Sequence, residues 1–419
     1  MTVSFKTFGC RLNRAETVRF EQAFAEAGVA TVPFGESSDI VVIHTCAVTQ
    51  TAESECLRLA RSLRRKNPGV FLVLSGCAAE SAKPETLASL GMDLIVHRNG
   101  RDKLAATVLD RLAERGSVDL PETAAPPNGT KLHRALLKVQ DGCSCFCTYC
   151  IVPHTRGVPR SRPFEACLEE AGRLLAEGFR EIVVVGCNLA FYEDGGRTLP
   201  DLLRALTGLS GNGRIRLSSL EPGKCEREVV SLMAQEPRLC NFLHLPLQSG
   251  SDPVLKRMGR GYSVAELRRV LDTICEQVPM LGLGADFITG FPGETEAMFN
   301  ETKQLIESYP FSNLHVFPYS ERPGTPAAAF DGKVPPETRK RRAHELIELR
   351  EQKKATFAKR HLGRTVDVLV ERIQDGSASG WTEDYLECRF ETTPPPRQGE
   401  LVKAVPYAVD GTALLAKGV

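Results

Sequence analysis

The sequence predicts an α/β protein in three parts: an N-terminal parallel α/β domain, a partial (βα)6 barrel and a small C-terminal β-barrel. Apolar runs alternate with amphipathic stretches over most of the chain, as in parallel strand–helix folds. A Pro-rich segment at 119–130 interrupts this alternation, and short apolar runs between turn residues replace it near the end. Because 419 residues exceed one ordinary core, the predicted parts are 1–120, a linker at 121–131, 132–360 and 361–419.

The first part has the pattern of a parallel sheet covered by helices. Its amphipathic stretches predict helices at 13–27 and 50–66, and Gly28 is a candidate C-cap for the first of them. Short apolar runs predict strands at 3–8, 40–44, 70–74 and 94–96.

The second part repeats the strand–helix alternation six times, which predicts a partial α/β barrel with its chemistry at the carboxyl ends of the strands. Strands are expected at 134–139, 181–185, 214–218, 242–247, 284–288 and 313–317. Helices are expected at 164–177, 199–209, 226–235, 264–277 and 294–308.

A long helix is predicted at 335–360, and the tail that follows has short predicted strands at 366–370, 385–390, 401–405 and 412–416. From Glu337 to Arg360 this helix carries nine Lys or Arg against four Asp or Glu. Either it is a solvated helix with ion pairs, or it contacts nucleic acid through residues such as Arg339 and Arg342. A small β-barrel of the kind expected for the tail often holds RNA.

Composition sets the broad class of the protein. A hydrophobic content of 42%, a charged content of 25% and a net charge of +1 are typical of a soluble globular protein with a weak overall field. We see no signal peptide and no run long enough to span a bilayer, so a cytoplasmic location without a membrane partner is expected. Fourteen cysteines in such a chain indicate metal sites and free thiols in a reducing compartment.

Cys143, Cys147 and Cys150 form a Cys-x3-Cys-x2-Cys run directly after the first predicted barrel strand. Three thiolates this close on one loop can hold a cuboidal iron–sulfur cluster and leave one iron open for a substrate or cofactor. A structural zinc site, which needs four ligands, is the alternative. Cys145 is its candidate fourth ligand, but alternation along an extended chain points Cys145 away from the other thiols.

Cys10, Cys46 and Cys77 each directly follow a predicted N-terminal strand. In a parallel sheet these three points lie along one edge, so the thiols are candidates for a second cluster with an open iron. The alternative is that they are small apolar residues that fill the strand ends.

Several long motifs follow one another along nearly the whole chain: Gly9-Cys10-Arg-Leu-Asn13, His44-Thr-Cys46, Ser75-Gly-Cys77, the Cys143 loop, Ser218-Ser-Leu-Glu221-Pro222, His244-Leu-Pro-Leu-Gln248-Ser249, Asp286-Phe-Ile-Thr-Gly-Phe-Pro-Gly-Glu294 and Tyr319-Ser-Glu-Arg-Pro-Gly-Thr325. In this order they resemble the radical SAM methylthiotransferase family. The resemblance implies two [4Fe–4S] clusters, on the two cysteine triads, and S-adenosylmethionine bound at the open iron of the barrel cluster. It also implies that the tail is an OB-like barrel called a TRAM domain.

Members of this family act on threonylcarbamoyladenosine in tRNA, on isopentenyladenosine in tRNA, or on an aspartate of a ribosomal protein. The opening motif and the tail motif Gly380-Trp-Thr-Glu-Asp-Tyr385 are similar to the threonylcarbamoyladenosine branch. Trp381 replaces the Tyr of that motif and Asp384 replaces its Asn. If that strand touches RNA, Trp381 would still stack on a base, whereas Asp384 would add repulsion.

The resemblance implies methylthio transfer to C2 of the modified adenosine-37, next to the anticodon, with the tRNA anticodon loop as partner. An electron donor and a sulfur source of unknown identity are also required. Barrel position suggests four side chains that hold S-adenosylmethionine, or are structural polar residues at strand ends: Asn188, Gln248, Ser249 and Arg260. The rival from another class is a non-catalytic iron–sulfur RNA-binding protein or redox sensor, which needs no S-adenosylmethionine.

Overall fold

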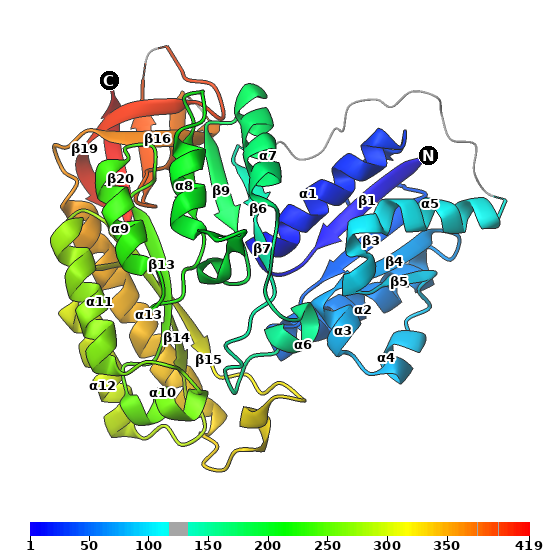
Figure 1. The fold of residues 1–419 in the computed structure, drawn as a ribbon, viewed down its shortest axis with the longest axis horizontal. Helices are drawn as coiled ribbons and strands as arrows, with labels where there is room; N and C mark the ends of the chain where they lie inside the picture. Colours follow the sequence, from blue (N-terminus) through cyan, green and yellow to red (C-terminus); the bar gives the residue numbers. More distant parts are fainter. Residues whose placement is uncertain (117–132, 375, 393) are drawn as a thin grey trace.

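The computed structural model describes residues 1–116, 133–374, 376–392 and 394–419 (Figure 1). The N-terminal residues form one body, and the barrel with the C-terminal tail forms a second body beside it (Figure 1). The predicted linker at 121–131 lies outside the described residues. The α/β class, the parallel sheets and the small C-terminal β-structure agree with the sequence prediction.

The N-terminal body is a five-stranded parallel sheet in the order β2-β1-β3-β4-β5. Its strands are β1 (Thr2–Thr7), β2 (Ala30–Thr31), β3 (Ile40–Thr45), β4 (Phe71–Gly76) and β5 (Leu94–Val96). Its helices are α1 (Arg11–Glu26), α2 (Gln50–Lys66), α3 (Cys77–Ser81), α4 (Pro84–Ala88) and α5 (Leu104–Glu114), with a 3₁₀ turn at Arg98–Lys103. Apolar residues of α1 and α5 pack on one face, and those of α2 pack on the other. The two-residue strand β2, the helices α3, α4 and α5 and the 3₁₀ turn were not predicted, whereas the four longer strands and the helices α1 and α2 were.

The barrel contains six parallel strands in two three-stranded sheets, β12-β9-β6 and β13-β14-β15. Two isolated bridges, Ile215 with Leu239 and Ser219 with His244, join the β12 segment to the β13 segment. The strands are β6 (Ala135–Lys138), β9 (Glu181–Val185), β12 (Arg214–Leu217), β13 (Phe242–Gln248), β14 (Gly282–Thr289) and β15 (Phe311–Pro318). The predicted partial (βα)6 barrel is therefore confirmed.

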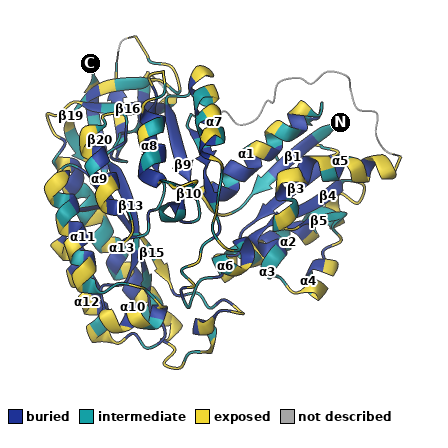
Figure 2. Ribbon diagram, in the orientation of Figure 1, coloured by how far each residue is buried: buried dark blue, intermediate teal, exposed yellow. Residues whose placement is uncertain are grey.

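Helices cover the outer face of this barrel and bury one continuous apolar core against it (Figure 2). They are α7 (Phe164–Ala176), α8 (Leu199–Thr207), α9 (Glu226–Gln235), α11 (Val264–Gln277), α12 (Glu296–Ser308) and α13 (Pro336–Lys359). Helix α12 begins two residues later than expected because the Thr295 hydroxyl caps it by accepting from Met298 N. Shorter elements are α6 (Val152–Arg156), α10 (Asp252–Met258), β7 (Gln140–Asp141), β8 (Arg160–Ser161), β10 (Glu193–Asp194) and β11 (Arg197–Thr198), with 3₁₀ turns at Leu189–Phe191 and Pro326–Ala329.

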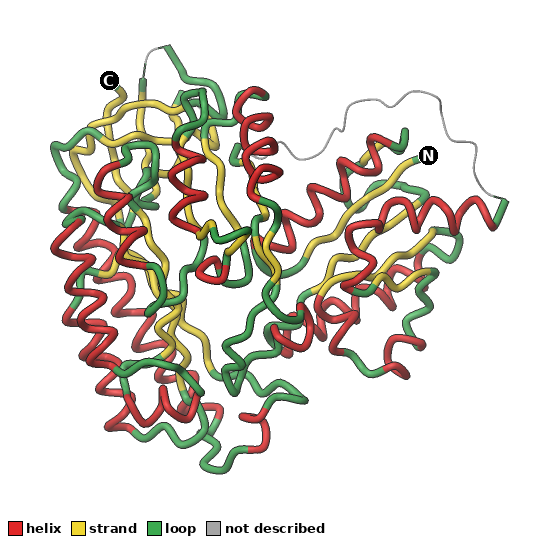
Figure 3. The backbone as a smooth tube through the Cα atoms, viewed as in Figure 1, coloured by secondary structure: helices red, strands yellow, loops and turns green. Residues whose placement is uncertain are grey.

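The tail closes into a five-stranded barrel in the order β16-β17-β18-β20-β19 (Figure 3). Its strands are β16 (Val366–Gln374), β17 (Ser377–Trp381), β18 (Glu387–Glu391), β19 (Leu401–Asp410) and β20 (Ala413–Gly418). β17 was not predicted as a separate strand, since Ser, Ala and Gly dominate its sequence. Phe357 and Ala358 of α13 complete the core of this small barrel.

Arg214 and Arg216 attach the tail to the amino ends of the barrel strands. The Arg214 guanidinium donates to the carbonyl oxygens of Asp367 and Trp381 at 2.8 and 2.9 Å. Arg216 donates to the carbonyl oxygen of Thr382 at 2.9 Å. Within the described ranges, no helix is long and apolar enough to cross a membrane.

Candidate cluster-binding site

The loop with Cys143, Cys147 and Cys150 follows β6 and β7, at the carboxyl end of the barrel strands. Gly142 lets this loop pass close to the segment after α6, since its φ is +74° and an added Cβ would lie 2.1 Å from the Val158 carbonyl oxygen. Cys143 N donates to Gly157 O at 3.0 Å, on the same segment. Backbone contacts therefore hold the loop in place, in addition to the short spacing of its cysteines in the sequence.

The three thiols of this loop fit a multi-iron cluster better than a single ion. Burial raises the pKa of Cys150 to about 12, and negative charge on Cys147 and Cys143 adds to the effect, so the three sulfurs are neighbours. The three sulfur atoms are nevertheless not all within 4.8 Å of one another. Among the described residues, one other group of potential metal-binding side chains brings its ligand atoms that close together, and it does not include these cysteines. A cuboidal cluster spreads its thiolate ligands over separate irons, whereas one zinc ion would draw them together.

Cys145 corrects one expectation from the sequence. The loop is irregular, with Phe146 at φ +47°, so the side chains do not alternate as along a strand. The Cys145 thiol consequently lies beside Cys143, and its hydrogen bond is the largest factor that lowers the pKa of Cys143 to about 6. Asn188 Nδ2 lies 3.6 Å from the Cys145 sulfur and 3.9 Å from the Cys143 sulfur.

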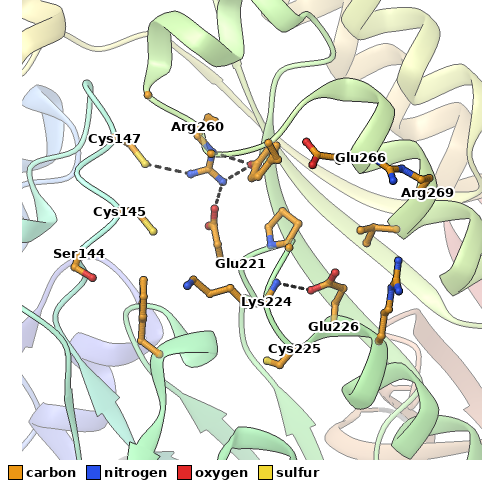
Figure 4. A pocket seen from close by; sticks show the side chains of 18 of the residues that line it. Ser144, Cys145, Cys147, Glu221, Lys224, Cys225, Glu226, Arg260, Glu266 and Arg269 are labelled. Carbon is orange, nitrogen blue, oxygen red and sulfur yellow. Dashed lines mark hydrogen bonds and ion pairs between the residues drawn. The ribbon is translucent and has the colours of Figure 1, made fainter.

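A cleft of about 840 Å³ opens beside this loop, with Cys145 and Cys147 on one side (Figure 4). Arg260 reaches across it: Nη1 lies 3.2 Å from the Cys147 sulfur, and Nη2 pairs with Glu221 at 2.6 Å (Figure 4). Arg260 Nη2 also donates to the Pro246 carbonyl oxygen at 2.9 Å. The guanidinium expected to bind a cofactor carboxylate thus already holds a carboxylate of this chain.

The four predicted cofactor residues differ in position. Asn188 and Arg260 contact the cysteine loop directly. Gln248 is buried at the end of β13 with a φ of +70°, an uncommon conformation for a residue other than glycine. Ser249 is 1% exposed and its hydroxyl lies 3.2 Å from the Thr302 hydroxyl of α12, so it faces that helix and its expected cofactor contact stays a prediction.

The second triad is gathered from three strand ends of the N-terminal sheet. Cys10 precedes α1, Cys46 follows β3, and Cys77 begins α3 directly after β4. Burial raises the pKa of Cys46, and negative charge on Cys77 and Cys10 raises it further, so these thiols are also neighbours. Gly9 leaves room for them, because a Cβ there would lie 2.8 Å from the Cys46 sulfur. Cys10 is exposed, whereas the other two thiols are buried.

A buried ionic network centred on Glu16 of α1 joins the two cysteine sites. Its carboxylate accepts from Lys138 Nζ at 2.6 Å, from both terminal nitrogens of Arg156 at 3.0 Å, and contacts His44 Nε2 at 2.9 Å. Burial alone would raise the pKa of Glu16, but Arg156 and the other partners hold it well below its ordinary value. Lys138 and Arg156 flank the barrel cysteine loop in sequence, so the network fixes the N-terminal sheet against that loop.

The predicted RNA contacts are only partly compatible with the structure. Arg342 is buried and its guanidinium pairs with Glu294 at 2.6 Å and Glu296 at 2.9 Å, which argues against the expected phosphate contact. Arg339 donates to the carbonyl oxygens of Val334 and Tyr319, which argues against a phosphate contact there.

Trp381 lies at the amino ends of the barrel strands, opposite the cysteine loop. Its ring packs against Tyr385 with centroids 5.1 Å apart, and its Nε1 donates to Glu371 at 3.0 Å. An RNA contact by Trp381 therefore stays a prediction for a surface other than the cysteine site. Asp384 is buried against His361 and Thr382, which argues against repulsion of RNA by its carboxylate.

Of the charged side chains around the two triads, sequence reasoning identifies Arg260 as a candidate site residue, and its partner Glu221 stands out only as part of a longer motif. Nothing in the sequence assigns a role to Glu16 or to its partners Arg156 and Lys138. A buried charge leaves no periodic signal in one sequence, and its partner is brought to it only by the fold.

Comparisons with known proteins now decide the family. The Radical SAM superfamily pattern matches residues 137–306, and residues 2–97 match Uncharacterized protein family UPF0004. A threonylcarbamoyladenosine tRNA methylthiotransferase MtaB of Bacillus subtilis is 35% identical over 94% of this chain and 91% of its own. The chain belongs to the radical SAM methylthiotransferase family. Members of the radical SAM superfamily use S-adenosylmethionine and a [4Fe–4S] cluster.

Other relatives place this methylthiotransferase near two branches of the family. A threonylcarbamoyladenosine tRNA methylthiotransferase MtaB of Thermotoga maritima is 35% identical over 93% of this chain and 91% of its own. A tRNA-2-methylthio-N(6)-dimethylallyladenosine synthase of Erythrobacter litoralis is 34% identical over 88% and 86%. The solved radical S-adenosylmethionine methyltransferase TsrM of Kitasatospora setae shares the fold of this methylthiotransferase, with a TM-score of 0.59 at 12% identity over 90% and 80% of the chains.

Proposed function

We propose that this methylthiotransferase adds a methylthio group to C2 of N6-threonylcarbamoyladenosine at position 37 of tRNA. The observation that carries the proposal is the pair of cysteine triads at the carboxyl ends of two separate parallel sheets, joined by the Glu16 network. The names of the Bacillus and Thermotoga relatives support the choice of substrate.

The six cysteines are the proposed ligands of two [4Fe–4S] clusters, one on each triad: Cys10, Cys46, Cys77, Cys143, Cys147 and Cys150. When bound, the barrel cluster supplies the electron that cleaves S-adenosylmethionine, and the second cluster supplies the sulfur that is transferred. A separate electron donor and sulfur source complete this proposal. The division into 1–120, the linker 121–131, a barrel at 132–360 and a TRAM-like tail at 361–419 also belongs to it.

Several side chains of the chain itself prepare this site. Arg260 places a fixed positive charge 3.2 Å from the Cys147 sulfur and is held there by Glu221. The Asn188 amide lies near the Cys143 sulfur, which adds a weak donor to the same loop. Arg156 and Glu16 set the spacing between the two triads, which matters because a reacting base must contact both sites at once.

The substrate atom explains why two sites are needed. A C2–H bond of adenine is not acidic, so ordinary proton abstraction by a side chain does not activate it. The base must leave the stack of the anticodon loop to enter between the two sites, as bases of single-stranded RNA can. The cleft of about 840 Å³ beside the cysteine loop gives room for a cofactor at that loop.

Nucleoside mass spectrometry of tRNA tests the proposal. In cells without this gene, the methylthio derivative of threonylcarbamoyladenosine should disappear and its precursor should accumulate. If only the isopentenyl derivative changes, the sister activity named in the Erythrobacter relative is the correct one. If no tRNA nucleoside changes, the substrate is a ribosomal protein or the chain is a non-catalytic iron–sulfur protein.

Iron analysis tests the two clusters independently of the substrate. The reconstituted wild-type chain should bind about eight irons, four for each cuboidal cluster. Triple Cys→Ala substitution of either triad should leave about four irons. A wild-type value near four irons would contradict the second cluster.

A further inference from the structure

His244, Asp286 and His315 form a polar cluster inside the barrel that the two cysteine sites do not include. They lie on the adjacent strands β13, β14 and β15. Asp286 is paired in register with His315, and Gly284 is paired with His244. The next residues on these strands, such as Leu245 and Ala285, belong to the apolar core on the opposite face. The cluster therefore faces the inside of the barrel.

The three side chains are held in a fixed arrangement. Asp286 Oδ1 lies 3.1 Å from His315 Nδ1 and 3.2 Å from His244 Nε2. The other ring nitrogen of His244, Nδ1, lies 2.9 Å from the Ser219 hydroxyl, which fixes the orientation of the ring. The two imidazole rings are 5.0 Å apart. Each ring thus presents one nitrogen to the same carboxylate oxygen.

One buried atom of this cluster is left without a hydrogen bond. His244 Nε2 is close to Asp286 but is not aligned for a hydrogen bond, and its side chain is only 8% exposed. A buried polar atom whose one charged neighbour is poorly aligned is incompletely satisfied, and a bound polar group would complete its hydrogen bonding. Gly284 keeps the space beside this ring open, because an added Cβ would lie 2.8 Å from His244 Cδ2.

The cluster is accessible at His315, whose side chain is 50% exposed. Burial would raise the pKa of Asp286, but the two neighbouring imidazoles hold it well below its ordinary value, so the carboxylate is ionised. The cluster thus offers imidazole nitrogens and a carboxylate acceptor in one place.

The cluster also lies on the strand that reaches the cysteine site. Pro246 O accepts from Arg260, which contacts the Cys147 sulfur. His244 is two residues before Pro246 on β13, about 7 Å along the strand. A base held at the cysteine loop can therefore extend a substituent toward His315.

We propose that His315, positioned by Asp286 and His244, binds the N6 side chain of the substrate base and selects a polar side chain over an apolar one. The proposal rests on the function proposed above. A threonylcarbamoyl group carries urea N–H groups, a urea carbonyl oxygen, a hydroxyl and a carboxylate, which match the donors and the acceptor of the cluster. An isopentenyl group has none of these and would leave His244 Nε2 without a hydrogen bond, which is how hydrogen-bonding sites reject apolar analogues.

The test uses the reconstituted full chain and two anticodon stem-loop RNAs, one with threonylcarbamoyladenosine and one with isopentenyladenosine. We expect His315→Ala to lower kcat/KM for the threonylcarbamoyl RNA by roughly 100-fold, mainly through KM, and to change cleavage of S-adenosylmethionine less than twofold. His315→Gln, which keeps a donor, should recover part of the loss. His344→Ala is the matched control, because His344 is an exposed histidine of α13.

Three results would overturn the proposal in distinguishable ways. If the wild-type chain modifies the threonylcarbamoyl RNA and His315→Ala does so equally well, the proposed contact by His315 is wrong but the proposed function stands. If the wild-type chain modifies only the isopentenyl RNA, the proposed function fails and this contact fails with it. If the wild-type chain holds one divalent ion besides cluster iron, and His315→Ala and Asp286→Asn both lose it, the three side chains are metal ligands and not substrate contacts.

Discussion

The two cysteine triads differ in how they are assembled. Cys143, Cys147 and Cys150 lie on one short loop, so their proximity is set by eight consecutive residues. Cys10, Cys46 and Cys77 come from three strand ends and meet only because β1, β3 and β4 are neighbours in one sheet. A local site tolerates changes elsewhere as long as its own loop is intact, whereas a site built from distant segments depends on the whole sheet.

The largest expected effect separates the roles of the two triads. Cys147→Ala should lower cleavage of S-adenosylmethionine about 1,000-fold or more, because it removes a ligand of the cluster that supplies the electron. Cys46→Ala should leave cleavage nearly unchanged while methylthio transfer is lost. Product analysis by mass spectrometry measures both reactions. Cys240→Ala is the control, as Cys240 is a buried thiol outside both triads, and loss of cleavage in Cys46→Ala would contradict the assignment.

A second experiment tests whether the barrel site depends on its loop alone. In Gly142→Ala the new Cβ would lie 2.1 Å from the Val158 carbonyl oxygen, so the cysteine loop must move. We expect iron content to fall by about half, from about eight to about four, with the N-terminal triad unaffected. Gly223→Ala is the control: φ is +84° there, but no atom lies within 4 Å of the added Cβ. Full iron in Gly142→Ala would show that the loop is not tightly constrained.

A third experiment tests the connection between the two sites. Glu16→Gln removes the charge that faces Arg156 and Lys138 in a buried position, and breaking such a pair costs about 3–5 kcal/mol. The free energy of unfolding from denaturant titration should fall by that amount, with methylthio transfer reduced more than cleavage of S-adenosylmethionine. Glu26→Gln, an exposed position on the same helix, should change stability by less than about 0.5 kcal/mol. Equal effects of the two substitutions would exclude a structural role for the network.

The smallest effect is expected in the tail, where His361 and Asp384 pair with each other and Tyr385 contacts Arg11. Burial would lower the pKa of His361, but Asp384 beside it raises the pKa above its ordinary value. The folded pKa is therefore higher than the unfolded value of 6.5, so this pair stabilises the tail fully below about pH 6.5 and loses its contribution as pH rises through the folded pKa. Unfolding measured from about pH 6 to pH 9 should show this loss in the wild type.

Asp384→Asn provides the comparison for that pH dependence. Without the carboxylate, His361 loses the interaction that raises its pKa, so the difference in stability between low and high pH should shrink. Iron content and both reactions should stay unchanged, because the tail lies at the amino ends of the barrel strands. A pH dependence equal to that of the wild type would mean that another group is responsible.

Much of the fold followed from the sequence because its signals are local. Helices such as α2 (Gln50–Lys66) and α11 (Val264–Gln277) begin and end where their periodic pattern does. Each barrel strand is a short apolar run bounded by turn residues, and this pattern is enough to predict six strand–helix units. β17 escaped prediction because Ser, Ala and Gly carry little strand signal, and its pairing with β16 and β18 decides its conformation.

The residues of the candidate site also divide into those that the sequence predicts and those whose contacts it does not predict. The spacing of Cys143, Cys147 and Cys150 is enough to predict the chemistry of that loop, since nearby residues on a short loop cannot separate. The spacing of residues along the chain did not reveal which partners the polar and charged side chains contact. Arg342, expected to contact RNA, is buried against Glu294, and Ser249, expected to contact a cofactor, faces α12. Periodicity reports which face of an element is apolar, but not which buried partner a single polar side chain meets.

The sequence by itself determined the class of fold, the order of its parts and the two sets of thiols. The tertiary structure decided which distant side chains share a site. Glu16 meets Arg156, and Asp286 meets His244 and His315, only because separate strands and helices bring them together. The physical reason is that hydrophobic patterns repeat along the chain and are readable locally, whereas a buried charge is stabilised by one specific partner that can lie anywhere in the sequence.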